Sequence, residues 1–378
     1  MPLNIVDSTD SHHIPIRTLV LDGTPLAVWT PIMPYIRLHH PFDSDGVYIL
    51  SRFAYLRRAE EQCVLEHPDA LVRIDFLDGR ALALFGQLIG GLEVDQAFRE
   101  FIVTAGFMDA VVSENAASRN RWSFHDRLFQ AKTRTGGRRL QQPKYKVDAP
   151  ADLPPVVIPL NPHATYIPLY KPDLAALTQT DPSFTAVLES RRTRYDYADT
   201  PITVNQLGEF LYRAARIQRV VQGSDYEGSL RPSAGAGALH ELNLYIVAAR
   251  CEGLEQDIYL YDPLRHQVGK LNTSFGFDDL LANATMMTGG QVSVPQVLIV
   301  ITAQFDRINW KYPDTALSLV LKDVGVLYQT MYLVATAMGL APCALGGGDA
   351  KLFNRIAELR EHEQSVGEFL LGSSIQNL

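Results

Sequence analysis

The sequence predicts an α+β fold, because strand patterns and long helical patterns are mixed in its C-terminal half without regular alternation. Apolar, β-branched or aromatic runs at Leu244–Ala248, Ile258–Tyr261 and Val297–Ala303 are typical of strands. Residues 312–340 form mostly one long helical pattern, and Glu368–Leu371 predicts a short final strand. We see no strand–helix–strand alternation of Rossmann type.

Composition restricts the class of protein. The chain has 378 residues, 47% of them apolar, and a net charge of −8, which fits a soluble protein of two domains and argues against nucleic-acid binding. The three cysteines form no CxxC pair, so we expect no disulfide framework and a cytoplasmic location. No signal peptide is recognised. The apolar segment Leu317–Leu340 carries Lys322 and Asp323, which predicts a buried helix rather than a membrane span.

Prolines divide the chain. Nine of the 22 prolines lie between Pro143 and Pro182, and proline removes backbone donors, so we expect an extended connector there, without a helix or a central strand. The predicted domains are an N-terminal module over residues 1–147, a connector over 148–182 and a C-terminal domain over 183–378.

The N-terminal module is predicted to be winged-helix-like. Leu71–Phe76 alternates like a half-buried strand, and Ala81–Ile89 and Val94–Ala105 have helical patterns, with Gly106 as a helix-ending glycine. Small helices beside a strand pair fit such a module, which commonly binds a partner.

A basic stretch follows this module. Nine Lys or Arg residues and one Asp lie between Arg119 and Lys146. Two interpretations stay open: a solvated face of the protein, or a docking surface for an acidic peptide or a phosphate.

Helix-start signals open the C-terminal domain. Asp181-Pro182 predicts an N-cap followed by proline at the first helical position, and the helix then runs to Glu189. Thr203 with Gln206 three residues later predicts a capping box.

The run Arg191-Arg192-Thr193-Arg194 is the first candidate site. Three guanidinium groups repel one another, and an anion would offset this repulsion. A phosphate fits, because guanidinium groups bind its oxygens two at a time and the threonine adds a donor. Solvated arginines in ion pairs are the alternative.

Two glycine-rich segments and one Lys-Tyr pair are further candidates. Small residues over 231–238 and 344–349 would let backbone N–H groups approach a flat ligand, although both could be plain turns. Lys311-Tyr312 could exchange a proton with a substrate, or be an ordinary surface pair. The pairs His12-His13 and His39-His40 lack carboxylate or cysteine neighbours, so no metal site is expected.

In the order of its motifs, the C-terminal half resembles the flavin-dependent nitroreductase superfamily, and within it the SagB-type peptide dehydrogenases, the azoline oxidases of thiazole/oxazole-modified microcins. The segments that carry the resemblance are Arg191 to Tyr197, Ser233-Ala234-Gly235 with Ala238-Leu239-His240, Lys311-Tyr312, Gly339 to Asp349, and Ser365 to Gly372. Trp122 to Asp126 resembles, more weakly, an extra module that many of these dehydrogenases carry.

This resemblance implies an FMN-dependent nitroreductase-like fold and a set of site residues. Arg191, Arg192, Thr193 and Arg194 would bind the FMN phosphate, although Tyr195 stands where the family usually has a second basic residue. The resemblance further implies that Ser233, Ala234 and Gly235 lie by the flavin ring, commonly from the partner of a homodimer, and that Leu345, Gly346 and Gly347 present a backbone N–H to the flavin N5. Lys311 and Tyr312 would be the catalytic pair.

The function implied is dehydrogenation of azoline rings in a ribosomal precursor peptide to thiazole or oxazole, with dioxygen reoxidising the flavin and a cyclodehydratase complex as a partner. Three alternatives stay open. They are an NAD(P)H-dependent nitroreductase or quinone reductase, an oxidase of a carrier-bound nonribosomal peptide, and a non-catalytic scaffold in the peptide-modifying complex.

Overall fold

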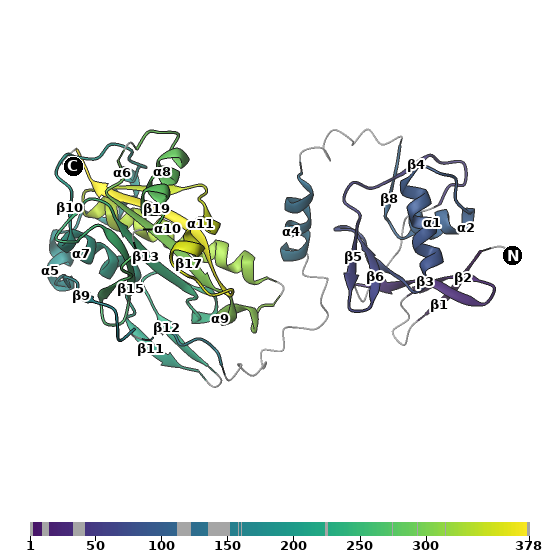
Figure 1. Ribbon diagram of the computed structural model, residues 1–378, viewed down its shortest axis with the longest axis horizontal. Coiled ribbons are helices and arrows are strands. Elements are labelled where there is room, and N and C mark those ends of the chain that lie inside the picture. The colour runs from purple at the N-terminus through teal and green to yellow at the C-terminus, as the bar shows by residue number, and fades with distance from the viewer. Residues whose placement is uncertain are drawn as a thin grey trace. The chain divides into compact units, whose positions relative to one another are not determined.

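The computed structural model divides the chain into two compact units, residues 1–144 and 145–378 (Figure 1). The described residues are 3–9, 15–32, 42–111, 122–134, 152–157, 159, 161–223, 226–273, 275–292, 294–313 and 315–375. Most of the basic stretch Arg119–Lys146 and both histidine pairs lie outside these ranges.

The N-terminal unit is built on a six-stranded antiparallel sheet with the order β1-β2-β3-β7-β6-β5. Its strands are β1 (Asn4–Thr9), β2 (Pro15–Leu21), β3 (Thr24–Pro31), β5 (Tyr55–Ala59), β6 (Gln62–Glu66) and β7 (Val72–Phe76). Helices α1 (Gly79–Ile89) and α2 (Gln96–Thr104) bury Phe85, Phe98 and Phe101 in one core with Trp29 of β3. A ribbon of β4 (Tyr48–Leu50) with β8 (Met108–Ala110), and helix α4 (Phe124–Arg134), complete the described part.

The winged-helix-like module is not confirmed, because the described residues contain a large sheet rather than a strand pair beside small helices. The predicted strand at Leu71–Phe76 and the two predicted helices are present, and Gly106 has a φ of +86° just after α2. The missed sheet has a local signal in Asp22-Gly23, which turns β2 into β3 with φ values of +50° and +77°. That dipeptide between two apolar runs is typical of a hairpin.

The C-terminal unit is built on a seven-stranded sheet with the order β18-β19-β17-β13-β15-β16-β9, antiparallel at each pairing. The strands are β9 (Tyr166–Pro168), β13 (Leu242–Ala248), β15 (Asp257–Asp262), β16 (Gln267–Lys270), β17 (Val297–Gln304), β18 (Leu340–Leu345) and β19 (Glu363–Ser373). Sheet and helices together make the α+β fold that the sequence predicts.

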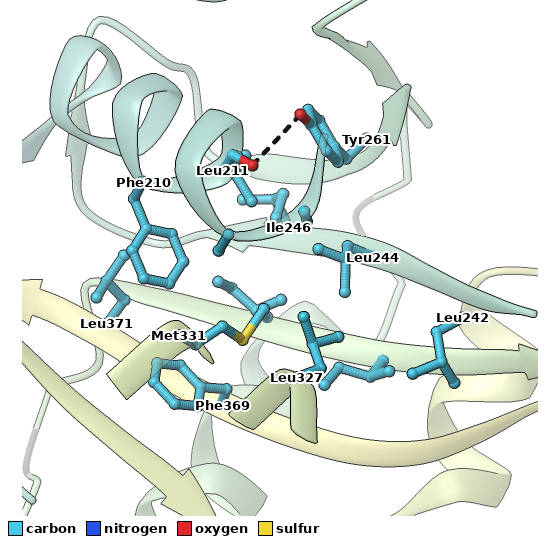
Figure 2. Close-up of a cluster of buried hydrophobic side chains, with 14 of the residues drawn as sticks. Phe210, Leu211, Leu242, Leu244, Ile246, Tyr261, Leu327, Met331, Phe369 and Leu371 are labelled. Carbon is cyan, nitrogen blue, oxygen red and sulfur yellow. Dashed lines mark hydrogen bonds between the residues drawn. The ribbon is translucent and has the colours of Figure 1, made fainter. Parts of the chain in front are cut away.

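Helices cover both faces of this sheet. On one face α7 (Val204–Ala215) and α10 (Ala316–Ala337) share a core with β13 and β19, as Figure 2 shows for Phe210, Met331 and Phe369. On the other face α8 (Phe277–Met287) and α11 (Ala350–Ile356) pack against the same sheet. The remaining short elements are α5 (Leu174–Thr180), α6 (Phe184–Ser190), β10 (Ile202–Thr203), β11 (Arg219–Gln222), β12 (Glu227–Leu230), the 3-10 turn η1 (Ala236–Ala238), β14 (Cys251–Glu252) and α9 (Phe305–Asn309).

Some local predictions are confirmed. The capping box joins Thr203 and Gln206 in both directions. The three predicted inner strands are β13, β15 and β17, each a little longer than expected. The cysteines Cys63, Cys251 and Cys343 are free.

Three local predictions are wrong. The N-cap of α6 is Ser183 rather than Asp181, because the Ser183 side chain accepts from the Ala186 N–H, whereas Asp181 ends α5 and its carboxylate pairs with Arg213. The proline-rich stretch does contain a helix, α5, because no proline occurs between 173 and 181 and Asp173 caps its start. The long helical pattern predicted over residues 312–340 forms a helix only over Ala316–Ala337, since Gly339, with a φ of +66°, ends it and strand β18 follows.

Among the described residues, α10 is the helix long and apolar enough to cross a membrane by length and composition alone. Its Val320, Leu327 and Met331 are buried in the core on the sheet, as expected for a buried helix. Leu317 and Leu321, one turn apart, are 44% and 45% exposed.

Candidate functional site

The arginine-rich bend follows α6 directly. Arg191 closes the helix, and the Arg192 guanidinium donates to the carbonyls of Glu189 (2.8 Å) and Arg191 (2.7 Å). Arg192 and Arg194 line one narrow cleft with Ser190, Thr336 and Ser374. Across the described ranges neither Arg191 nor Arg192 forms an ion pair, so these cations can bind an exogenous anion.

Tyr195 explains how the bend differs from the family pattern. Its ring packs against the hydrophobic cluster under α8 and α11, so it points into the protein rather than into the cleft. The Arg194 N–H donates to the Pro342 carbonyl (2.9 Å), which anchors the bend to β18. Arg194 therefore lines the cleft together with Arg192, whereas the Tyr195 side chain packs in the hydrophobic core.

Tyr332 of α10 connects the bend to the glycine run, and the sequence analysis missed it. Its hydroxyl is hydrogen-bonded to Thr193 Oγ1 (3.0 Å) and accepts from the Ala344 N–H (2.8 Å). The Arg191 guanidinium lies 5.3 Å from the centre of its ring. The tyrosine thus holds Arg191 and Thr193 beside the end of β18, which is Leu345 and is followed by Gly346 and Gly347.

The glycine run is open on one side and closed on the other. Leu345 is buried, whereas Gly346 and Gly347 are exposed. A Cβ atom on Gly346 would meet no atom within 4 Å, so a flat ligand has room there. At Gly348 a Cβ would collide with the carboxyl group of Glu368, so a larger residue there would require that side chain to move.

Glu368 of β19 is a buried carboxyl beneath this run. It is 4% exposed, and burial, assisted by Asp349, raises its pKa to about 7. The folded protein therefore holds this proton more tightly than the unfolded chain does.

We predict that stability falls as pH rises from about 4.5 to about 7, by up to about 3 kcal/mol from this group, and levels off above. Glu368→Gln should remove this part of the pH dependence, measured by urea unfolding at several pH values. The exposed Glu252→Gln variant is the control. An unchanged slope in Glu368→Gln would contradict the assignment.

The segment of small residues over 231–238, here called the small-residue turn, has an uncommon backbone conformation at its end. Ser233 is buried, Ala234 is exposed, and the residues after Gly235 form η1. Gly237, Ala238 and His240 have φ values of +58°, +58° and +46°. Left-handed backbone at residues other than glycine costs free energy, and such strain is concentrated at functional sites.

Lys311 and Tyr312 converge on this turn. A Cβ on Gly237 would lie 2.9 Å from Lys311 Nζ and 2.9 Å from Tyr312 Oη, so only glycine leaves room for both groups. The structure thus brings the predicted catalytic pair to the turn that begins with Ser233-Ala234-Gly235.

Two further residues support the pair and carry no sequence signal. Tyr226 Oη accepts from Lys311 Nζ (2.7 Å) and donates to the Gly237 carbonyl (2.8 Å). Arg307 of α9, 2% exposed, donates to the carbonyls of Leu239 and Glu227 (both 3.0 Å) and of Pro154. The Tyr226 hydroxyl is thus engaged by Lys311 and the Gly237 carbonyl, whereas within the described residues the Tyr312 hydroxyl has no hydrogen-bond partner.

The site residues fall into two groups. The first group consists of the arginine bend and Leu345–Gly347, which lie around Tyr332. The second group consists of the small-residue turn with Lys311 and Tyr312. The Ala236 N–H of this turn donates to Asp323 of α10 (2.8 Å). Asp323 and Tyr332 are nine residues apart on α10, about 14 Å along the axis and on opposite sides of it. Within the described part of one chain, we find no hydrogen bond or ion pair between the two groups.

Two segments of the chain match the models of known protein families. Residues 188–373 match the Nitroreductase family model, and residues 48–139 match the model of the cyanobactin oxidase ThcOx. "Putative nitroreductase MJ1384" of Methanocaldococcus jannaschii is 27% identical over 177 residues, which cover 47% of this chain and 84% of that protein.

Solved structures are similar to the C-terminal part at low identity. A "putative nitroreductase" of Ralstonia eutropha JMP134 is 17% identical, with a TM-score of 0.45, over 61% of this chain and 99% of that one. A chain of the Escherichia coli microcin synthetase McbBCD complex with truncated pro-MccB17 is 15% identical, with a TM-score of 0.40, over 55% and 83%.

Residues 188–373 thus match the nitroreductase family, whose members generally use a flavin, and this part of the chain has a nitroreductase-like α+β fold. Together with the oxidase match over residues 48–139, this supports an oxidoreductase. The resemblance to the SagB-type peptide dehydrogenases of this superfamily is confirmed.

Proposed function

We propose that the protein dehydrogenates azoline rings in a ribosomal peptide to thiazole or oxazole with FMN as cofactor. The observation that carries the proposal is the convergence of Lys311 Nζ and Tyr312 Oη on Gly237 within the part of the chain that matches the nitroreductase family. The match of residues 48–139 to a cyanobactin oxidase model supports a peptide as the substrate.

The residues present fit FMN. Arg192 and Arg194 in one cleft, with Ser190 and Thr193 nearby, suit a phosphate, because guanidinium and hydroxyl donors match its oxygens. The open face of Gly346 suits a flat ring, and the exposed backbone of Gly346 and Gly347 can offer N–H groups to the ring edge.

FMN, when bound, supplies a two-electron acceptor for hydride that dioxygen reoxidises. Tyr312 is the proposed general base for the ring proton, since its hydroxyl lies beside Gly237 together with Lys311 Nζ. The Lys311 ammonium nitrogen lies 5.6 Å from the centre of the Tyr312 ring, where its positive charge can stabilise negative charge that develops during proton transfer. Tyr226 and Gly237 fix the direction of that ammonium.

We propose a homodimer in which each flavin site takes its small-residue turn from the second copy. The 14 Å separation of the two residue groups along α10 supports this, because one chain leaves the ring side of the site incomplete. The exposed pairs Phe184/Leu188 on α6 and Leu317/Leu321 on α10 offer an apolar surface to the partner.

The dimer is testable by sedimentation and flavin content. Leu317→Lys with Leu321→Lys should give a monomer that retains less than about a tenth of the flavin, because two buried charges cost several kcal/mol. Leu264→Lys, at a similarly exposed leucine (42%), is the matched control. A wild-type monomer that holds FMN would contradict the dimer.

Turnover tests the function. Under air, the purified protein should remove two hydrogens per ring from an azoline peptide, measured by mass spectrometry. Rapid bleaching of the flavin by NADPH without any loss of hydrogen from the peptide would favour the nitroreductase alternative, which the family match also allows. A colourless protein without flavin would favour the scaffold.

A peptide-modifying complex remains part of the proposal. A microcin synthetase complex lies among the solved structures similar to this chain, and we propose a modified precursor peptide and a cyclodehydratase complex as partners. The cytoplasmic location stays a prediction.

A further inference from the structure

Glu241, just before β13, is a buried acid for which the proposed mechanism has no use. It is 1% exposed, and neither of its carboxyl oxygens has a hydrogen-bond partner among the described residues. An ionised carboxylate without donors is costly to bury. The protein therefore needs another way to accommodate this group.

Asp323 of α10 faces the same small cavity. The two carboxyl groups line it together with Ser233 and Gly235 of the small-residue turn, and it holds about 20 Å³, enough for one water. Asp323 Oδ2 accepts from the Ala236 N–H (2.8 Å), so the aspartate is tied directly to the backbone of the turn.

The cations around the cavity are engaged elsewhere. Arg231 lines the cavity, and its charge partly offsets the effect of burial, which raises the pKa of Glu241, but its guanidinium donates to Ser229 Oγ (3.2 Å) and the Leu242 carbonyl (3.5 Å). Arg307 donates to three carbonyls, and among described residues neither arginine forms an ion pair with Glu241 or Asp323. Lys322 neighbours Asp323 on α10. His240, packed on Gly235, is neutral, because burial lowers its pKa to about 3.

We propose that Glu241 and Asp323 share one proton, with the Glu241 carboxylic acid donating to Asp323, and that this pair positions the small-residue turn against Lys311 and Tyr312. The shared proton gives the Glu241 carboxyl the partner it otherwise lacks. Asp323 then accepts from two sides, from Glu241 and from the Ala236 N–H, one residue before Gly237. The catalytic part of this inference rests on the proposed function.

Electrostatics agree with the geometry. Burial and the nearby Asp323 raise the pKa of Glu241 to about 7, and burial also raises the pKa of Asp323. Loss of the shared proton above this pH would leave two carboxylates in one cavity, and their repulsion would release the turn. The turn should therefore be in place at acidic to neutral pH and loosen as pH rises.

The test compares pH profiles of kcat and KM for azoline oxidation in Glu241→Gln, Glu241→Ala and the wild type. The glutamine amide donates to Asp323 at every pH, so Glu241→Gln should lose the decline in kcat above about pH 7. Glu241→Ala lacks the donor and should lose about tenfold in kcat at all pH values. Glu252→Gln, at an exposed glutamate, is the control.

A second readout separates this inference from the proposed function. The infrared spectrum of the wild type should contain a protonated-carboxyl C=O band at pH 6 that is missing in Glu241→Gln and retained in Glu368→Gln, whatever the substrate is. Absence of a band attributable to Glu241 would overturn the shared proton. If the wild type had the band but Glu241→Gln kept the wild-type pH profile of kcat, the positioning role would be overturned. If Glu241→Gln lost as much kcat as Glu241→Ala at all pH values, the carboxylate would act through the charge of Arg231 and the shared proton would be overturned.

Discussion

Tyr312→Phe and Lys311→Met are expected to abolish azole formation while FMN stays bound. The loss should be at least about 10²-fold in kcat for each variant, because the step then lacks a positioned base or the ammonium that assists it. FMN content should not change, since neither side chain belongs to the group around Tyr332. Turnover is followed by mass spectrometry and flavin content by absorbance.

The chain offers a matched control in the adjacent residues Tyr170 and Lys171, which are both exposed. Tyr170→Phe and Lys171→Met make the same chemical changes away from Gly237 and should keep full turnover. Tyr226→Phe should give an intermediate loss, because it leaves Lys311 in place without its hydrogen-bond acceptor. Unchanged turnover in Tyr312→Phe would remove its assigned role.

Arg192→Ala and Arg194→Ala are expected to weaken FMN binding by about 10- to 100-fold each, the effect of losing a charge-assisted contact of about 1.5 to 3 kcal/mol. Riboflavin, which lacks the phosphate, should bind equally well to the wild type and both variants. Titration of the apoprotein with each flavin, followed by fluorescence quenching, measures both affinities.

Arg219→Ala, at an exposed arginine of β11, is the control for removing a positive charge from the same unit. If the arginine variants lost affinity for riboflavin and FMN by the same factor, the cleft would not hold the phosphate. The bend would then have a structural role, such as closing α6 through the Glu189 carbonyl.

The part of the site that could be predicted from the sequence consists of runs of neighbouring residues. Arg191 to Arg194, Ser233 to Gly235 and Lys311-Tyr312 are each contiguous, so their chemistry is visible in one short window. The inner strands of the C-terminal sheet were predictable for a similar reason, since a strand buried on both faces is a continuous apolar run.

The connecting residues could not be predicted in this way. Tyr332 meets Thr193 across 139 positions, Tyr226 meets Lys311 across 85, and Asp323 meets the Ala236 N–H across 87. A single tyrosine or aspartate in a helix or loop has no local pattern that distinguishes it from a surface residue. The packing of α10 on the sheet brings Tyr332 and Asp323 to their partners, and the segment after α9 brings Lys311 to Tyr226.

The N-terminal unit was predicted less well for a different reason. Its sheet pairs strands that are far apart in the chain, such as β3 with β7, and the strongest local sign of it was the Asp22-Gly23 turn between the apolar runs of β2 and β3. The sequence pattern therefore indicated helices α1 and α2 and one strand clearly, but not the six-stranded sheet on which they pack.

An anaerobic single turnover tests the central claim most directly. The FMN-loaded protein is mixed with an azoline peptide in the absence of dioxygen and NADPH, while the flavin absorbance and the peptide mass are followed together. We predict that the flavin bleaches and that one azoline ring loses two hydrogens for each flavin reduced. In Tyr312→Phe the flavin should stay oxidised and the peptide mass should not change. A flavin that stays oxidised while the peptide mass is unchanged, in a protein that holds FMN, would contradict the account.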